Sequence, residues 1–84
     1  MTLSYFTLQV GWVKLDTKKI MTIHKTILTR DQRISISHNN ESSWNLHIDK
    51  VEEEDRGWYM CQVNTDPLMA RKFFLEVTGT SAFF

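Results

Sequence analysis

The sequence predicts an all-β fold, with room for one domain in its 84 residues. Apolar and polar side chains alternate with a period of two in one segment after another, and no apolar stripe with the helical period persists. Hydrophobic residues make up 42% of the chain, which is typical of globular proteins and not of disordered ones. A chain this short buries only about 60 to 65% of its extended surface, so we expect a small core.

Two neighbouring strands are expected at 10–15 and 20–23. Trp12 and Val13 point to opposite faces of the first strand, because successive side chains of a strand alternate. The polar link 16–19 separates this strand from the apolar run that follows.

A hairpin with one buried face is expected next. Ile34 and Ile36 alternate with serines, and a second alternating run occupies 44–49. The polar residues 39–43 lie between the two runs and predict the turn.

The remaining segments predict a corner followed by two strands. Residues 51–57 are mostly acidic and end in glycine, which favours a short helical turn or a corner over a strand. Alternation resumes at 59–63, the chain turns at 65–68 around its only proline, and a β-rich run follows at 72–77.

The most specific motif is D-x-G-x-Y-x-C, from Asp55 to Cys61, with Trp12 lying 49 residues before the cysteine. Gly57 permits a close approach of the backbone at the corner. Asp55 is placed to form an ion pair with Arg33, which precedes the third expected strand. The motif alone is weak, but its combination with the tryptophan, the arginine and the strand spacing is specific.

With these motifs, the chain resembles the first immunoglobulin domain of insect lachesins and Dpr-interacting proteins. The vertebrate IgLON adhesion proteins are similar at a greater distance, and the Dpr proteins share the string QVNT at 62–65. The resemblance extends from about residue 9 to about residue 77. It is carried by residues 11–14 (GWVK), 16–17 (DT), 33–38 (RISISH), 44–48 (WNLHI) and 57–67 (GWYMCQVNTDP).

The resemblance implies an immunoglobulin-like β-sandwich of the V type. In that fold, Tyr59 turns its hydroxyl back onto the corner, and Trp12 packs against an inter-sheet disulfide to which Cys61 contributes one half. The residues with expected structural roles are Trp12, Arg33, Asp55, Gly57, Tyr59 and Cys61.

The cysteine count departs from the family's pattern. The partner cysteine on strand B belongs about a dozen residues before Trp12, at or before the first residue, and Cys61 is the only cysteine. We therefore expect an incomplete sandwich that lacks strands A and B. Its expected parts are a non-family leader at 1–8, a partial domain at 9–77 and a non-family tail at 78–84. A truncated gene model or a splice fragment would explain both ends.

Such an incomplete sandwich is expected to be marginally stable, aggregation-prone or unfolded. The loss of a disulfide costs a small secreted domain about 2 to 5 kcal/mol, which is comparable to the whole stability of many domains. The absence of strand B would also leave one sheet with an unprotected edge. The side chains expected to lose their cover are Ile36, Trp44, Leu46 and Ile48.

For function, the resemblance implies an extracellular adhesion module that binds another immunoglobulin domain, either a Dpr-like domain or a second copy of itself. Contacts between neurons or between epithelial cells are the implied setting. Alternation places an apolar cluster on the outer face of the sheet built from strands C, C′, F and G. Whether the side chains of residues 20–23 point inward or outward stays open. The expected contact residues are Val13, Leu15, Ile20, Met21, Ile23, Met60, Gln62, Asn64 and Phe74.

Two other functions stay open, and both lack catalysis. One is a soluble secreted binding protein with a ligand site in the loop 65–68, and the other is a truncated product without function. We expect neither enzyme activity nor a cofactor or small-molecule substrate. Cys61 has the position of one half of a disulfide, not of a nucleophile. The sequence also contains no nucleophile elbow, phosphate-binding loop or dinucleotide fingerprint.

Charge and hydropathy bear on partners and location. Ten basic residues balance ten acidic ones, so nucleic acid is not an expected partner. No apolar run approaches the 18 residues that a bilayer span needs, and residues 1–10 lack the features of a secretory signal. We expect the intact family protein at the cell surface, with any membrane attachment supplied by parts outside this chain.

Three further groups of polar residues are the histidines, an acidic run and a glycosylation sequon. The spacing of the three histidines, at positions 24, 38 and 47, matches no metal-ligand motif, and the acidic run 52–55 is better explained as a solvated corner. Asn40 begins an N-glycosylation sequon in the expected turn at 39–43.

Overall fold

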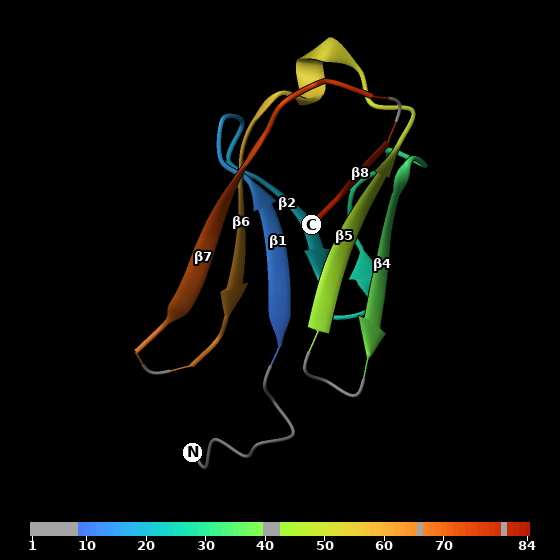
Figure 1. The fold of residues 1–84 in the computed structure, drawn as a ribbon. Coiled ribbons are helices and arrows are strands. Elements are labelled where there is room, and N and C mark those ends of the chain that lie inside the picture. Colours follow the sequence, from blue (N-terminus) through green and yellow to red (C-terminus); the bar gives the residue numbers. More distant parts are fainter. Residues whose placement is uncertain (1–8, 40–42, 66, 80) are drawn as a thin grey trace.

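The computed structural model describes residues 9–39, 43–65, 67–79 and 81–84, and these form two antiparallel β-sheets that face each other (Figure 1). The predicted all-β sandwich is thereby confirmed. The larger sheet has the strand order β3-β2-β1-β6-β7, with β1 at Val10–Lys14, β2 at Lys19–Ile23, β3 at Thr26–Ile27, β6 at Gly57–Val63 and β7 at Met69–Leu75. The smaller sheet has the order β4-β5-β8, with β4 at Ile34–Asn39, β5 at Ser43–Asp49 and β8 at Ser81–Phe83.

The pairing of β1 with β2 contains a β-bulge. Trp12 lies opposite Thr22, whereas Val13 lies opposite Ile20, so Met21 is the inserted residue on β2. The insertion breaks the alternation of β2, and Met21 packs in the core with only 8% of its surface exposed. The expectation that Met21 belongs to the outer contact face is therefore wrong, because the bulge turns its side chain inward.

The β4–β5 hairpin has the register that its alternation predicts. Ile34 lies opposite Ile48 and Ile36 lies opposite Leu46, so the apolar side chains of both strands share the inner face. Leu46 is fully buried and Ile48 is 1% exposed. The expected loss of cover is therefore wrong for Leu46 and Ile48, whereas Ile36 and Trp44 are half-buried.

The cover comes from the last strand. β8 pairs with β5 on the side opposite to β4, and the chain then reaches Phe84 between the two sheets (Figure 1). The ring of Phe84 lies 5.3 Å from that of Tyr59, 5.6 Å from that of Phe73 and 5.8 Å from that of Trp12, measured between centroids. An aromatic cluster of this kind closes the centre of the core.

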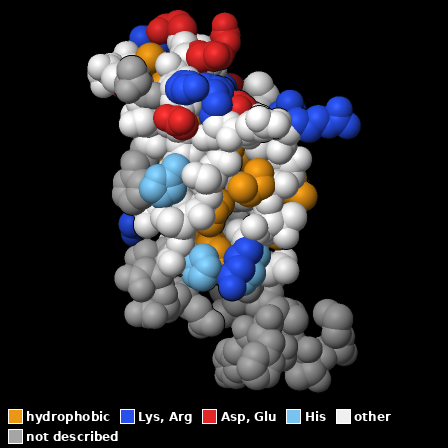
Figure 2. All heavy atoms as spheres, turned by 90° about the vertical axis from the view of Figure 1, so that its right-hand side faces the viewer, with side chains coloured by type: hydrophobic (Ala, Val, Ile, Leu, Met, Phe, Trp, Pro, Cys, Tyr) orange, Lys and Arg blue, Asp and Glu red, His pale blue; other side chains and the backbone are white. Residues whose placement is uncertain are grey.

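The corner between the sheets has the predicted short helical turn, a 3-10 helix at Glu53–Asp55. Gly57 follows it with a φ of +137°, which L side chains rarely adopt. A Cβ at this position would come within 1.8 Å of a carboxylate oxygen of Asp16. Charged side chains gather at this end of the molecule (Figure 2).

Candidate binding face

The face of the larger sheet that points away from the smaller one, called the outer face from here on, is defined by cross-strand pairs. Met60 of β6 lies opposite Val13 of β1 and opposite Lys72 of β7, and Trp58 lies opposite Phe74. Trp12, Tyr59 and Leu75 belong to the core, so their strand neighbours point the other way. The residues of the outer face are Gly11, Val13, Ile20, Ile23, Trp58, Met60, Gln62, Ala70, Lys72 and Phe74.

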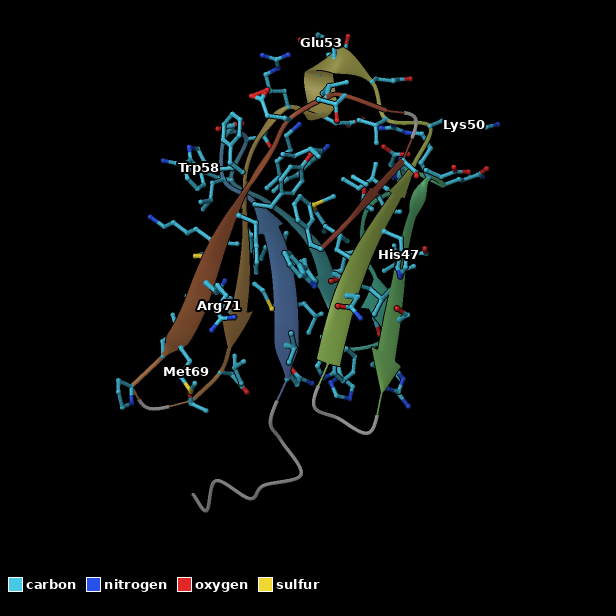
Figure 3. The ribbon with its side chains drawn as sticks, in the orientation of Figure 1. His47, Lys50, Glu53, Trp58, Met69 and Arg71 are labelled. Atoms are coloured by element: carbon cyan, nitrogen blue, oxygen red, sulfur yellow. The ribbon has the colours of Figure 1, made fainter. Side chains whose placement is uncertain are left out.

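Three large apolar side chains of the outer face are exposed. Ile20 has 51% of its surface exposed, Trp58 has 46% and Phe74 has 44%. The rings of Trp58 and Phe74 meet edge to face, with their centroids 5.2 Å apart. Trp58 lies on the side of the sheet away from the smaller sheet (Figure 3). Exposed apolar groups gathered in this way mark interaction surfaces.

Trp58 was missing from the residues expected to make contact. The signal was in the sequence, because Trp58 stands two positions before Met60 and a strand brings such residues to one face. Trp58 is an unspecified position of the D-x-G-x-Y-x-C motif, between Gly57 and Tyr59, so the motif itself carries no information about its side chain.

The other expected contact residues differ in how accessible they are. Val13 lies at the centre of the outer face but is only 8% exposed, whereas Leu15, Ile23, Met60 and Gln62 are half-buried. The amide nitrogen of Leu15 donates a hydrogen bond to the carbonyl oxygen of Trp58 at 3.0 Å, so the face continues past the end of β1. Direct contact is therefore easiest at the exposed aromatic pair and at Ile20.

Asn64 has a role within the fold. Its side-chain oxygen accepts a hydrogen bond from the backbone N–H of Gln9 at 2.7 Å, and its own N–H donates to the carbonyl oxygen of Gln9 at 3.2 Å. These two bonds join the chain just before β1 to the chain just after β6. Asn64 thus extends the β1–β6 ladder by one pair.

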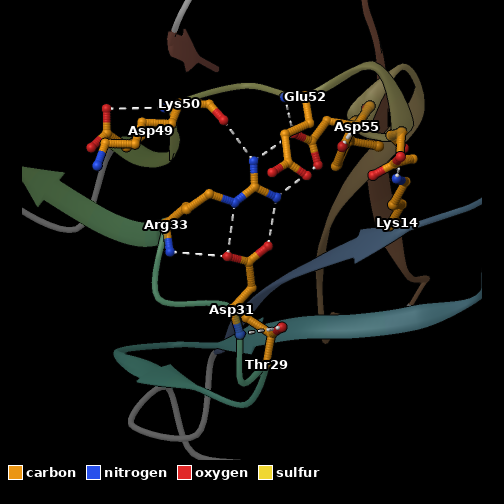
Figure 4. A network of polar contacts seen from close by, with 10 residues as sticks. Lys14, Thr29, Asp31, Arg33, Asp49, Lys50, Glu52 and Asp55 are labelled. Atoms are coloured by element: carbon orange, nitrogen blue, oxygen red, sulfur yellow. Dashed lines mark hydrogen bonds and ion pairs between the residues drawn. The ribbon is translucent and has the colours of Figure 1, made fainter.

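At the opposite end of the sandwich, Arg33 joins three segments through all five of its N–H groups (Figure 4). It donates to Asp55 at 2.8 and 3.0 Å, to Asp31 at 2.7 and 3.0 Å, and to the carbonyl oxygen of Lys50 at 2.9 Å. The expected pair with Asp55 is present, and Asp31 is a second carboxylate partner that was not expected from the sequence.

This network sets the charge states of its members. Burial disfavours the charged form of Asp55, but hydrogen bonds from Arg33 and from the backbone N–H of Glu52 outweigh it, so its pKa lies below the usual value. The hydrogen bond from Arg33 likewise lowers the pKa of Asp31, and the two carboxylates raise the pKa of Arg33. The corner is therefore fixed by permanently charged groups at neutral pH.

Tyr59 and Trp12 belong to the core, and Cys61 packs against it. The Tyr59 hydroxyl donates to the backbone carbonyl of Asp55 at 2.5 Å, and burial raises the pKa of the hydroxyl. Trp12 is 2% exposed and lies opposite Cys61 in the β1–β6 register. Cys61 carries a free, half-buried thiol, and burial raises its pKa while the charge of Arg71 opposes that shift. A raised pKa makes the thiol a poor nucleophile.

The remaining candidate positions are the glycosylation sequon and the three histidines. Asn40 lies outside the described residues. His38 stacks on the ring of Trp44, and His24 contacts the same ring at a tilt of 40°. His47 forms a hydrogen bond with Ser37 at 2.8 Å. Within the described ranges, no three histidine, cysteine or acidic side chains gather as a metal site would require. None of the helices in the described part of the chain has the length and apolar character that crossing a bilayer requires.

Comparison with known sequences gives one family and one curated relative. The model of the immunoglobulin domain family matches residues 7–74. The Zwei Ig domain protein zig-8 of Caenorhabditis elegans is 27% identical over 69 residues, which cover 82% of this chain and 26% of that protein. The chain thus spans about a quarter of the relative that it matches.

Several solved structures are similar to this chain. One is Dpr1 IG1 bound to DIP-eta IG1, with a TM-score of 0.82 and 39% identity over 86% of this chain and 69% of that one. Another is Dpr2 Ig1-Ig2 in complex with DIP-Theta Ig1-Ig3, with a TM-score of 0.76 and 41% identity over 81% of this chain and 23% of that one. The ZIG-8–RIG-5 IG1 heterodimer has a TM-score of 0.80 at 22% identity, covers 93% of this chain and 68% of that one, and supports the fold alone.

Proposed function

This chain belongs to the immunoglobulin domain family, and from that premise we propose that it binds another immunoglobulin domain through its outer face. The observation that supports the proposal is the exposed aromatic pair of Trp58 and Phe74, which lies with Ile20 on a face that no other part of the described chain covers. The similar Dpr1 and Dpr2 structures are complexes of immunoglobulin domains. The proposed setting is extracellular cell adhesion and recognition, without catalysis.

The physical chemistry of the face suits a protein partner. Aromatic side chains dominate the energetics of such contacts, because they bury much area while losing little conformational freedom. Gln62 and Lys72 lie beside the apolar groups and supply polar contacts that can distinguish one partner from another. Trp58, Phe74 and Ile20 would carry most of the binding energy.

The test is a binding measurement with immobilised immunoglobulin domains, namely this chain itself and the first domains of Dpr and DIP proteins. Trp58→Asp should weaken binding by about 30-fold or more, because it removes an exposed aromatic anchor and would bury a charge in the contact. Circular dichroism should show an unchanged fold, since the side chain is exposed. An unchanged affinity in the folded variant would contradict the proposal.

A loop-based ligand site is the second candidate, and one observation favours it. Leu68, in the connection from β6 to β7, is 59% exposed, and Met69, the first residue of β7, is 61% exposed. Leu68→Asp serves as the matched control for Trp58→Asp, because both place a charge at an exposed apolar position. If Leu68→Asp abolished binding while Trp58→Asp preserved it, the loop site would be the right one.

A further inference from the structure

A pocket of about 480 Å³ lies beside β2. Most of its lining comes from β1, β2, β4, β6 and the segment 28–31, and its described lining residues all lie between positions 14 and 59. The volume is within the range of about 300 to 1,000 Å³ that is typical of small-molecule sites. Of the residues that form the outer face, only Ile20 also lines the pocket, so the two features are separate.

Apolar side chains line the pocket from its interior to its mouth. Tyr59, Ile34 and Met21 form the buried part and are 1%, 4% and 8% exposed. Met21 is available here because the β-bulge turns its side chain inward. Ile20 and Leu28 form the exposed part and are 51% and 50% exposed. The pocket therefore offers apolar surface to the tail of a ligand.

Three cationic side chains also line the pocket, and two of them face each other. Lys14 of β1 lies directly opposite Lys19 of β2, and like charges in such a position destabilise a sheet. Arg30 is the third cation of the lining. Among the described residues, none of these three cations has a carboxylate within ion-pair distance. An anionic ligand would relieve their mutual repulsion.

The carboxylates at the pocket are already neutralised. Asp31 and Asp55 line it, and both accept hydrogen bonds from Arg33 at 2.7 to 3.0 Å (Figure 4). The ammonium of Lys14 donates to the backbone carbonyl of Glu54 at 2.6 Å, which holds it in place. An ammonium has three N–H groups, so the other two are available to a ligand. Because the acidic groups are bound to Arg33, the remaining charge at the pocket is positive.

We propose that this pocket binds an amphipathic anion with the chemistry of a fatty-acid carboxylate. The tail would lie along Met21, Leu28 and Ile34, and the carboxylate would lie between Lys19 and Arg30. The apolar lining disfavours a fully hydrated anion such as inorganic phosphate, and the cations disfavour a neutral or cationic amphiphile. The site binds without catalysis, is distinct from the outer face and goes beyond the function proposed for that face.

The test is a titration of the full chain, labelled at its methyl groups, with sodium decanoate below its micelle concentration, followed by NMR. We expect saturable shifts of the methyl signals of Met21, Leu28 and Ile34, and none at Val63, at the far end of β6. Decyltrimethylammonium, which has a similar tail and the opposite charge, should bind at least about tenfold more weakly. The same holds for acetate, which lacks the tail.

Charge reversal at the mouth supplies the matched variants. Lys19→Glu and Arg30→Glu should each weaken decanoate binding by about tenfold, because each replaces an attractive group with a repulsive one. Lys72→Glu, at an exposed position of the outer face, is the control and should leave the affinity unchanged. All three side chains are exposed, so circular dichroism should show the fold of the parent chain.

Absence of saturable shifts, decyltrimethylammonium that binds as tightly as decanoate, or equal affinities of the three charge-reversal variants would overturn the proposal. Loss of decanoate binding in Trp58→Asp would also overturn it, because the amphiphile would then lie on the outer face. If a charge-reversal variant is unfolded, the parent chain decides the question through its salt dependence. Added sodium chloride should weaken decanoate binding, and an affinity that does not depend on salt would contradict the proposal.

Discussion

Replacing Arg33 with glutamine tests the claim that the corner holds the two sheets together. The change removes the charge and most of the five hydrogen bonds, and leaves the Asp55 carboxylate, whose side chain is 12% exposed, without its cationic partner. Removing one member of a buried ion pair costs about 3 to 5 kcal/mol. Because the side chain of Arg33 is 21% exposed and water screens the pair, we expect the lower end, about 3 kcal/mol.

The assay is urea unfolding followed by circular dichroism. At a typical slope of about 1.5 kcal/mol per molar urea, a loss of about 3 kcal/mol lowers the midpoint by about 2 M. Arg56→Gln is the matched control, because Arg56 forms an exposed ion pair with Glu53 at 3.0 Å. Its expected cost is below about 1 kcal/mol.

A double-mutant cycle identifies the partner. Arg33→Gln and Asp55→Asn should cost less together than the sum of their separate effects, by about 1.5 kcal/mol or more, because the two side chains interact directly. Equal destabilisation by Arg33→Gln and Arg56→Gln, or strict additivity in the cycle, would refute the reasoning.

Two further predictions concern the same corner. Folding lowers the pKa values of Asp55 and Asp31. The stabilisation from these two carboxylates is therefore complete above the unfolded pKa of about 3.9 and is lost as the pH falls through the folded pKa values. The urea midpoint should be lower at pH 3 than at pH 6, and the difference should be smaller in Asp55→Asn. A drop of equal size in that variant would contradict this. Gly57→Ala should lower the free energy of unfolding by about 1 to 3 kcal/mol, because the φ of Gly57 is +137° and the new Cβ meets Asp16. Gly79→Ala is the control: its Cβ would meet nothing within 4 Å, so the free energy of unfolding should change by less than about 0.5 kcal/mol. Equal midpoints for the two alanine variants would argue against strain at the corner.

Local pattern predicted most of the fold. Alternation placed β1, the β4–β5 hairpin and β6, and the acidic run before Gly57 indicated the corner. Each of these signals depends on residues close together in the chain. β3, with two residues, is too short to show a pattern. β7 begins at Met69, before the expected start at residue 72. The first part of β7 was missed because this exposed edge strand carries charged residues such as Arg71, which interrupt the apolar pattern.

The outer face was predicted in part. The alternation of side chains along a strand correctly placed Met60, Gln62 and Phe74 on one side of the sheet. It did not predict what fraction of each side chain is exposed to solvent. Val13 is buried at the centre of the sheet because strands lie on both of its sides, and accessibility depends on those neighbours. The use of these residues in partner binding stays a prediction.

By itself, the sequence determined the all-β class through its alternation. The seven-residue motif from Asp55 to Cys61, together with Trp12 and Arg33, indicated the burial of Trp12 and Tyr59 and the pairing of Arg33 with Asp55. Only the tertiary structure decided the inward turn of Met21, which follows from a bulge that no residue type announces. It alone also decided that Ser81–Phe83 covers β5. That pairing joins segments more than thirty residues apart, and its register depends on which edge the completed sheet leaves open.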